Sequence, residues 1–305
     1  MSDAAPTRLP RFVAWQGWRV DLPRRWDPVK LEGDASAGHA LFADAVRPRL
    51  GLRWQTPRRR RFDAAAAVMR TMVDEVGQLA AAEARAWPPP AGEWTSPLLY
   101  VEPDPPGRDV WVGYSPASGR LLSVACPVRR REHVLAKVIL PTLADLPLDR
   151  AAPWSVFDLS LVVPGGFALA ERRLNAGDLS LSFADRRGAK VSVRQVAVAE
   201  LALRRRPLDG WLADQQRGDR RHHRPAGPAA DVTVTVAGRA LAGRCGHLRR
   251  RRRFALATWR PSSLVTLAVH DADRDRLVIL HGTDEDLLRS VAGTVGAAPT
   301  GGSGP

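Results

Sequence analysis

Cysteine is scarce in this sequence of 305 residues, which contains only Cys126 and Cys245. Two thiols cannot form the disulfide framework of small secreted domains, and a chain of this length can build its core without one. Residues 1–10 hold no apolar stretch of signal-peptide length. The most apolar region, Leu159–Ala170, is too short for a membrane span and is broken by Pro164-Gly165-Gly166. These absences predict a protein of the reducing cytoplasm with no membrane span.

Lysine is nearly as scarce, since Lys30, Lys137 and Lys190 are its only three positions. Lysine and arginine together nevertheless number 46 against 32 acidic residues, and both halves of the chain share the resulting net charge of +14. Such an excess favours polyanionic partners, namely nucleic acid, an anionic membrane or an acidic protein. An alternative is that arginine, alanine, glycine and proline are abundant because the genome is GC-rich, without selection for binding.

The two halves of the sequence resemble each other. Residues 22–54 align with residues 163–195 without a gap, and Phe42-Ala43-Asp44 recurs there as Phe183-Ala184-Asp185. Two further pairs of blocks follow at equal spacing, Trp111–Tyr114 with Arg120–Val124 and Leu267–His270 with Arg276–Leu280. Conserved order and spacing predict an internal duplication, with modules at 1–150 and 151–298 and a flexible tail at 299–305.

Each module is predicted to be a mainly antiparallel sheet flanked by two helices, in the order β-β-β-α-β-β-β(-β)-α. Alternating or β-rich apolar segments indicate the strands, and apolar spacing with capping residues indicates the helices. The expected strands are 17–22, 38–44, 49–54, 98–101, 110–114, 121–126, 157–163, 178–184, 190–197, 232–236, 254–259, 265–269 and 277–281. The expected helices are 63–86, 132–143, 208–216 and 284–295. This order of elements predicts the α+β class.

One segment carries a resemblance to a known family. The stretch Trp18-Arg19-Val20-Asp21-Leu22-Pro23-Arg24-Arg25-Trp26 is an apolar strand that ends in Leu-Pro and is followed by tryptophan. It resembles the opening of Mog1/PsbP-like domains, whose length and element order are also similar. The resemblance implies an α/β/α sandwich and an accessory or binding role, and it assigns no functional residue. The second module has Phe167 in place of the tryptophan.

Runs of arginine are the strongest candidates for a binding site. Three of them, Arg58–Arg61, Arg129–Arg131 and Arg204–Arg206, precede expected helices, where cations oppose the helix dipole. An anion bound there would meet guanidinium groups and free backbone N–H groups. The alternative is solvated loop charge. The residues predicted to bind anions are Arg58, Arg59, Arg60, Arg61, Arg129, Arg130, Arg131, Arg249, Arg250, Arg251, Arg252 and Arg253.

Metal-binding and catalytic patterns are weak. His222, His223, Cys245 and His247 carry zinc-ligand groups, but their spacing fits no zinc template and the flanking arginines would repel a cation. The sequence has no nucleophile elbow, phosphate loop or Rossmann fingerprint. We therefore expect no metal, no cofactor and no enzymatic activity.

The repeated Asp44 and Asp185 each follow Phe-Ala at the end of an expected strand. Aspartate is common in turns, because its carboxylate accepts hydrogen bonds from nearby backbone N–H groups. We expect turn roles for both residues and a buried, inert thiol for Cys126. Most of the ten tryptophans are expected to pack in the core.

The composition and the missing motifs together predict a non-enzymatic cytoplasmic accessory protein that docks an acidic protein partner through a basic surface. The alternative is binding of nucleic acid or another polyphosphate through Arg58–Arg61 and Arg249–Arg253. That alternative lacks the aromatic residues that single-strand binders interleave with their basic residues. The sequence leaves the oligomeric state open.

Overall fold

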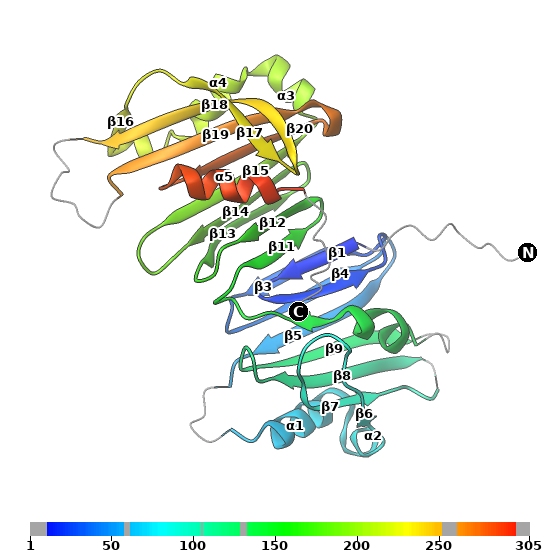
Figure 1. Cartoon of the computed structure of the whole chain (residues 1–305). Helices are drawn as coiled ribbons and strands as arrows, with labels where there is room; N and C mark the ends of the chain where they lie inside the picture. The colour runs from blue at the N-terminus through cyan, green and yellow to red at the C-terminus, as the bar shows by residue number, and fades with distance from the viewer. Residues whose placement is uncertain (1–10, 58–61, 105, 129–132, 252–260, 297–305) are drawn as a thin grey trace, which may run out of the picture. The chain divides into compact units, whose positions relative to one another are not determined.

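The structure is a computed structural model that describes residues 11–57, 62–104, 106–128, 133–251 and 261–296. The chain divides into two compact units. Unit 1 comprises Met1–Leu148 and Trp154–Phe157, and unit 2 comprises Asp149–Pro153 and Asp158–Pro305. The strands form three antiparallel sheets of five, seven and eight strands (Figure 1). Within the described ranges, no helix has the length and apolar character needed to cross a membrane.

Unit 1 contains the seven-stranded sheet, with the order β3-β4-β5-β9-β8-β7-β6. Its strands are β3 (Asp27–Gly33), β4 (Ala37–Ala43), β5 (Pro48–Gln55), β6 (Arg85–Ala86), β7 (Thr95–Tyr100), β8 (Gly107–Ser115) and β9 (Arg120–Val128). The unit also contains the hairpin of β1 (Arg11–Trp15) and β2 (Trp18–Leu22), with β10 (Ala144–Asp145) beside β2. Ser155 of β11 (Ala152–Val156) lies opposite Ala14 of β1.

Helix α1 (Ala64–Val76) covers one face of this sheet, where Val68 and Met72 pack with Val110 and Val112. Asp63 caps the helix, because its carboxylate accepts a hydrogen bond from the backbone N–H of Ala66 at 3.0 Å. Gly77 ends the helix with a φ of 87°, and the short helix α2 (Gln78–Ala82) follows. The unit closes with a π-helical turn at Leu135–Ile139 and a 3-10 turn at Leu140–Thr142.

Unit 2 contains the eight-stranded sheet, with the order β13-β14-β15-β20-β19-β18-β16 and with β17 paired to β18. The strands of the unit are β12 (Leu159–Val163), β13 (Ala168–Asn175), β14 (Asp178–Ala184), β15 (Lys190–Ala197), β16 (His223–Pro225), β17 (Ala230–Val236), β18 (Arg239–Arg250), β19 (Ser263–Asp271) and β20 (Arg276–Gly282). Its helices are α3 (Ala199–Arg205), α4 (Leu208–Gln215) and α5 (Glu285–Thr294), with 3-10 turns at 219–221 and 272–274.

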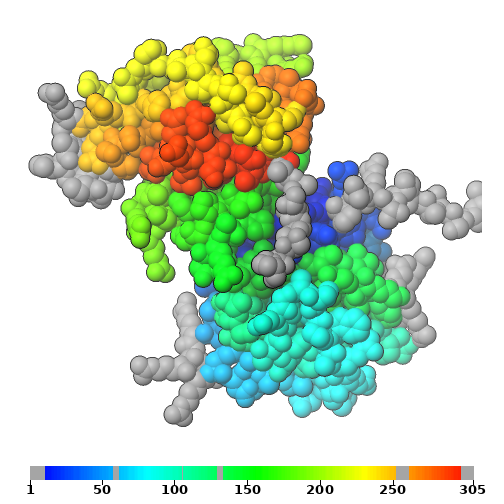
Figure 2. Space-filling view, in the orientation of Figure 1, coloured from blue at the N-terminus to red at the C-terminus, as the bar shows by residue number. Residues whose placement is uncertain are grey.

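The helices of unit 2 lie on opposite faces of its sheet (Figure 1). Leu212 of α4 packs with Ala268 and Ile279 on one face. Leu288 of α5 approaches Gly282 on the other face, where a methyl group on that glycine would come within 3.1 Å of the leucine side chain. In the space-filling view α5, in red, forms part of the surface of unit 2 (Figure 2). Apolar side chains of helices therefore pack against both faces of the sheet.

The sheets of the two units share one strand order. Matching β3, β4, β5, β9, β8 and β7 with β13, β14, β15, β20, β19 and β18 reproduces the same succession of neighbours. A β-bulge interrupts β3 between Pro28 and Lys30, and a bulge interrupts β13 at the aligned positions Leu169 and Glu171. A bulge changes the direction of a strand and does not follow from an alternating sequence alone. Bulges at aligned positions are therefore a second similarity between the two units, in addition to their strand order.

One arginine in each unit holds an aligned turn. Arg120 opens β9, is buried, and donates hydrogen bonds to the Gln16 carbonyl in the β1–β2 turn and to the Asp145 carboxylate. Burial lowers the pKa of Arg120, and the charge of Asp145 opposes that shift. The aligned Arg276 opens β20 and donates to the carboxylate of Asp158, in the turn after β11. Arg276 is more exposed than Arg120.

The predicted α+β class is wrong, because the protein is mainly β. The described residues form twenty strands and only five α-helices, none longer than the 13 residues of α1. The helix expected over 63–86 is interrupted at Gly77, whose positive φ breaks the alanine-rich run. The helix expected over 132–143 is reduced to two short turns, since Pro141 cannot donate a helical hydrogen bond. The helices therefore do not make two helix-flanked α+β modules.

Several strands were also absent from the prediction. The largest is β18, which runs through a segment rich in arginine and glycine that the sequence favours as a loop. The charged edge strand β13 and the short strands β1, β3 and β16 were missed as well. By contrast, β14 and β15 begin and end where their alternating residues predict. The strand expected over 254–259 lies outside the described residues.

Candidate functional site

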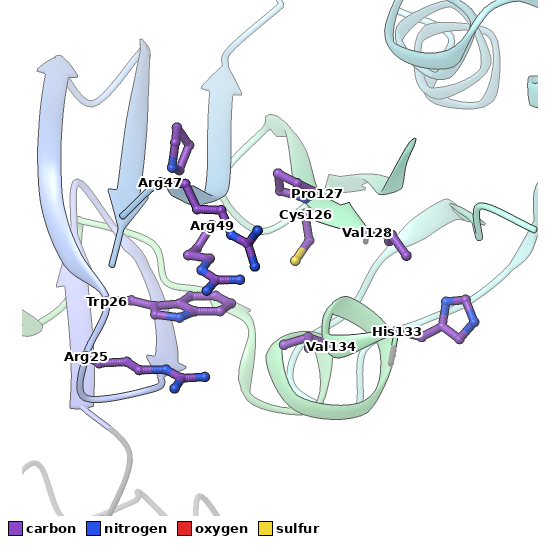
Figure 3. A pocket seen from close by; sticks show the side chains of 10 residues that line it. Arg25, Trp26, Arg47, Arg49, Cys126, Pro127, Val128, His133 and Val134 are labelled. Atoms are coloured by element: carbon purple, nitrogen blue, oxygen red, sulfur yellow. The ribbon is translucent and has the colours of Figure 1, made fainter. Parts of the chain in front are cut away.

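A polar pocket of about 440 Å³ opens in unit 1 where β5 begins and β9 ends. The pocket is lined by Arg25, Trp26, Arg47, Pro48, Arg49, Cys126, Pro127, Val128, His133 and Val134. Figure 3 shows Trp26 and the three arginines on one side of the pocket, with Cys126–Val128 and the turn carrying Val134 on the other. Three guanidinium groups thus border one concave site.

The turn between β4 and β5 positions two of these arginines. Asp44 accepts hydrogen bonds on Oδ1 from the backbone N–H groups of Val46 and Arg47, both at 2.9 Å, and so closes the turn. Its Oδ2 accepts a 2.5 Å hydrogen bond from Nε of Arg49. The bond from Arg49, with those from the backbone, lowers the pKa of Asp44 to about 2. Asp44 therefore stays ionised and orients Arg49 along the pocket wall.

The predicted turn role of both repeated aspartates is confirmed. Asp185 in unit 2 accepts hydrogen bonds on Oδ1 from the backbone N–H groups of Arg187 and Ala189, at 2.9 and 2.7 Å. The aligned positions of the arginines at the pocket, however, are Gly188 and Lys190. The turn is therefore common to both units, but its arginines differ in position, since the turn of unit 2 carries Arg186 and Arg187.

Two donors at the pocket lack protein partners among the described residues. Arg25 is exposed, and no described carboxylate lies within ion-pair distance of it. Trp26 is only 4% exposed, and its indole N–H makes no hydrogen bond within the described part of the chain. A buried N–H without a partner is costly, and a ligand atom that accepted it would remove that cost.

The remaining polar groups of the pocket are poorly suited to covalent chemistry. Burial raises the pKa of Cys126 to about 12, with the negative charge of Asp109 adding to the shift. The sulfur therefore remains a neutral thiol at physiological pH, which is a weak nucleophile. The His133 ring faces Asp109, with 3.3 Å between Nδ1 and Oδ2. The pocket is cationic and equipped to hold an anion reversibly.

Most of the arginines predicted from the sequence lie outside the described residues. These are Arg58, Arg59, Arg60, Arg61, Arg129, Arg130, Arg131, Arg252 and Arg253. Val128 and His133, which flank residues 129–132 in the sequence, both line the pocket. The pocket lining contains none of the predicted arginines that the structure describes.

The described part of the fourth run largely serves the backbone of unit 2. Nε of Arg250 donates to the carbonyl of Pro261 at 3.3 Å, and Nε of Arg251 donates to the carbonyl of His223 at 3.1 Å. Arg249 is exposed and lies directly opposite Arg224 of β16, an arrangement of like charges that is unfavourable without an anion. Of Arg249, Arg250 and Arg251, Arg249 alone is exposed to solvent opposite a second arginine.

The run Arg204–Arg206 precedes α4 (Leu208–Gln215), as predicted, and it also ends α3 (Ala199–Arg205), a helix that the sequence did not predict. Arg204 and Arg205 occupy the last turn of α3, where cations stabilise the helix dipole. Arg206 pairs with Asp214, and its guanidinium carbon lies 5.6 Å from the ring centre of Trp211. The ion pair with Asp214 therefore offsets the positive charge that Arg206 places beside the N-terminus of α4.

Unit 2 holds a hydroxyl–imidazole–carboxylate chain. Thr266 Oγ1 lies 2.8 Å from Nδ1 of His281, whose Nε2 lies 2.9 Å from Oδ2 of Asp219. Burial opposes ionisation of Asp219, but the hydrogen bond and charge of His281 outweigh it and lower the pKa of this carboxyl. Gln216 donates to the same threonine at 3.2 Å. Because Thr266 is 0% exposed, its hydroxyl is closed to a substrate, although the Asp219 end of the network is partly exposed.

The histidine and cysteine residues considered from the sequence separate into two places. The His223 ring contacts the carbonyls of Asp219 and Pro261, at 3.3 and 3.0 Å. Cys245 and His247 come together instead, with 3.3 Å between Sγ and Nε2. Burial raises the pKa of the Cys245 thiol to about 11, with the charge of Glu285 adding to the shift.

No known protein family and no curated protein sequence matches this chain. The resemblance to Mog1/PsbP-like domains stays a prediction.

Sequence reasoning missed Arg25, Arg47 and Arg49, because none of them belongs to a run of three or more arginines. One signal was available. The aligned turns at Asp44 and Asp185 differ in the residues that follow, so a comparison of the two halves isolates the arginines peculiar to unit 1.

Proposed function

We propose that the protein is a non-enzymatic accessory protein and that the pocket of unit 1 docks an acidic protein partner. The observation that carries the proposal is the convergence of Arg25, Arg47 and Arg49 on one pocket. A carboxylate from the partner would meet guanidinium groups already oriented by the turn at Asp44. The proposal places the protein in the cytoplasm, supported by two buried free cysteines.

We also propose that the two units arose by duplication of one module. The matched strand order, the aligned bulges and the arginines that hold aligned turns support this. The basic pocket would then be an addition made in unit 1 alone, since unit 2 has Gly166, Gly188 and Lys190 at the positions of its arginines.

Nucleic acid is the less favoured ligand for this pocket. Stacking of bases on aromatic rings supplies much of the affinity of single-strand binders, and Trp26 is too buried to offer a ring face. Arg250 and Arg251 donate to backbone carbonyls, which reduces their value as phosphate contacts.

The test is fluorescence anisotropy of a labelled glutamate-rich peptide titrated with the full chain at low salt. Arg25→Glu is expected to weaken binding roughly tenfold or more, since a hydrogen bond to a charged group contributes about 1.5–3 kcal/mol. Arg24→Glu is the matched control, because this neighbour is also exposed and the variant has the same net charge, but residue 24 does not line the pocket.

Equal losses in the two variants would show that overall charge, and not the pocket, binds the peptide. Stronger binding of duplex DNA than of peptide would favour the nucleic-acid alternative. In that case the logarithm of the affinity should fall with the logarithm of salt concentration by about 0.9 for each phosphate neutralised.

A further inference from the structure

Three side chains of unit 2 direct metal-ligand atoms at one another. They are Sγ of Cys245, Nε2 of His247 and Oε2 of Glu285, which all lie within 4.8 Å of one another. Cys245 and His247 are two positions apart on β18, so both side chains point to the same face of the sheet. Glu285 is the first residue of α5, the helix that packs on that face (Figures 1 and 2).

Two of the three distances between these atoms match the edges of a tetrahedral zinc site, and the third is within 4.8 Å. Zinc lies about 2.3 Å from sulfur and about 2.0–2.2 Å from nitrogen and oxygen, so neighbouring ligands in a tetrahedron are roughly 3.3–3.6 Å apart. The Sγ–Nε2 distance between Cys245 and His247 is 3.3 Å, and the Nε2–Oε2 distance between His247 and Glu285 is 3.5 Å. Little movement is needed to place an ion against all three atoms.

The carboxylate of Glu285 is held in the orientation that ligation needs. Nε and Nη2 of Arg289 both donate to Oε1, at 2.9 and 2.7 Å, which leaves Oε2 facing His247. Arg289 is itself fixed by a 3.0 Å hydrogen bond from Nη1 to the carbonyl of Thr233. Such a partner in the outer shell fixes one oxygen and directs the other at the ion.

The same geometry disfavours a cysteine–histidine–carboxylate catalytic triad. In a triad the imidazole contacts the nucleophile with one ring nitrogen and the carboxylate with the other. Here both Cys245 and Glu285 approach Nε2 of His247. Donor atoms that converge on one point suit an ion, whereas they give the imidazole no path for passing a proton between two partners.

We propose that Cys245, His247 and Glu285 bind a divalent zinc ion. The ion would take one ligand from each residue, and water would fill the fourth position, because His247 is half-exposed. The Cys245 thiol releases its proton to solvent as the sulfur–zinc bond forms. Thiolate and carboxylate together balance the charge of the ion. The site ties the first turn of α5 to β18, and it is independent of the pocket in unit 1.

The test is titration of the reduced full chain with Co²⁺, a spectroscopic substitute for zinc. The expected result is one equivalent bound, with a thiolate-to-cobalt charge-transfer band and the intense visible bands of tetrahedral cobalt, all removed by added Zn²⁺. Cys245→Ser should abolish the charge-transfer band. Cys126→Ser is the matched control, because it removes the other buried thiol and should leave the band unchanged.

Two further variants keep the test decisive if Cys245→Ser misfolds. His247→Asn changes a half-exposed side chain and should weaken cobalt binding at least tenfold with an unchanged circular dichroism spectrum. Arg289→Ala should weaken it about 10–100-fold, the range typical of outer-shell partners. The proposal is overturned if the wild-type chain shows no thiolate band, or if the folded His247→Asn chain binds cobalt as tightly as the wild type.

Discussion

Asp44 shapes the pocket without lining it. Its carboxylate closes the turn before β5 and holds Arg49 in place, so one acidic residue organises a basic site. Because Asp44 is ionised, it also reduces the repulsion between neighbouring guanidinium groups. The geometry proposed to bind an anion therefore exists before any ligand arrives, which would lower the cost of binding.

The lowered pKa of Asp44 makes a prediction about stability and pH. The folded-state pKa of about 2 lies below the ordinary value of 3.8, so ionised Asp44 stabilises the fold fully above 3.8. That contribution is lost as the pH falls through the folded value. Asp44→Asn should therefore have a lower melting temperature than the wild type at neutral pH, and the difference should shrink towards pH 2. A difference that stays constant over this range would contradict the assignment.

The aligned arginines Arg120 and Arg276 allow a matched comparison of burial. Arg120→Ala leaves the carboxylate of Asp145 buried without its partner and should cost about 3–5 kcal/mol. Arg276→Ala breaks a more exposed pair with Asp158 and should cost about 0–1 kcal/mol. Native-state hydrogen exchange of the backbone amides in β9 and β20 measures how much stability each variant loses. Similar losses in the two strands would show that burial does not set the difference.

At the scale of elements, replacing glycine by alanine should lower the stability of the protein at one position and raise it at another. Gly77 ends α1 with a φ of 87° and a ψ of 164°, a conformation that almost only glycine adopts, so Gly77→Ala should destabilise the fold by about 1–3 kcal/mol. Gly293 lies within α5 at a helical φ, and Gly293→Ala should stabilise by about 0.5–1 kcal/mol. A methyl group meets no atom within 4 Å at either position, which leaves conformation as the cause.

Hydrogen exchange of the amides in α1 and α5 checks this pair. Destabilisation at both positions, or at neither, would show that packing and not backbone conformation decides the outcome.

Alternating sequence predicted strands well where one side of the strand is buried. The ends of β14 and β15 could be placed because leucine, valine and phenylalanine alternate with polar residues. β18 carries four arginines, of which only Arg249 is exposed, and two glycines, so its pattern resembles a loop until neighbouring strands pair with it. The helices were overestimated, because an alanine-rich run conceals the break at Gly77.

The candidate sites were harder to predict than the strands, because they join residues that are distant in the sequence. Asp44 could be assigned to a turn from its repeated motif alone. Glu285 could not be connected to Cys245 and His247, since only the packing of α5 on the sheet brings it to β18. The pocket likewise depends on β5 and β9 lying side by side.

At the scale of the whole molecule, the proposed duplication and the net charge explain different properties. The shared strand order accounts for the fold of each unit, whereas among the described residues the pocket lies in unit 1 and the cluster of Cys245, His247 and Glu285 lies in unit 2. The net charge of +14 would attract many anions and raise association rates without selecting among them. Specific recognition therefore needs a built site, and the pocket of Arg25, Arg47 and Arg49 is the site that we propose in unit 1.

The most direct test of this claim is the ¹H–¹⁵N spectrum of the tryptophan side chains during titration with a glutamate-rich peptide. The indole N–H of Trp26 borders the pocket and has no partner among the described residues, whereas that of Trp54 donates to the Asp34 carbonyl at 2.7 Å. Docking in the pocket predicts a saturable shift of the Trp26 signal, with the Trp54 signal unmoved. A Trp26 signal that stays in place while the peptide binds would contradict the account.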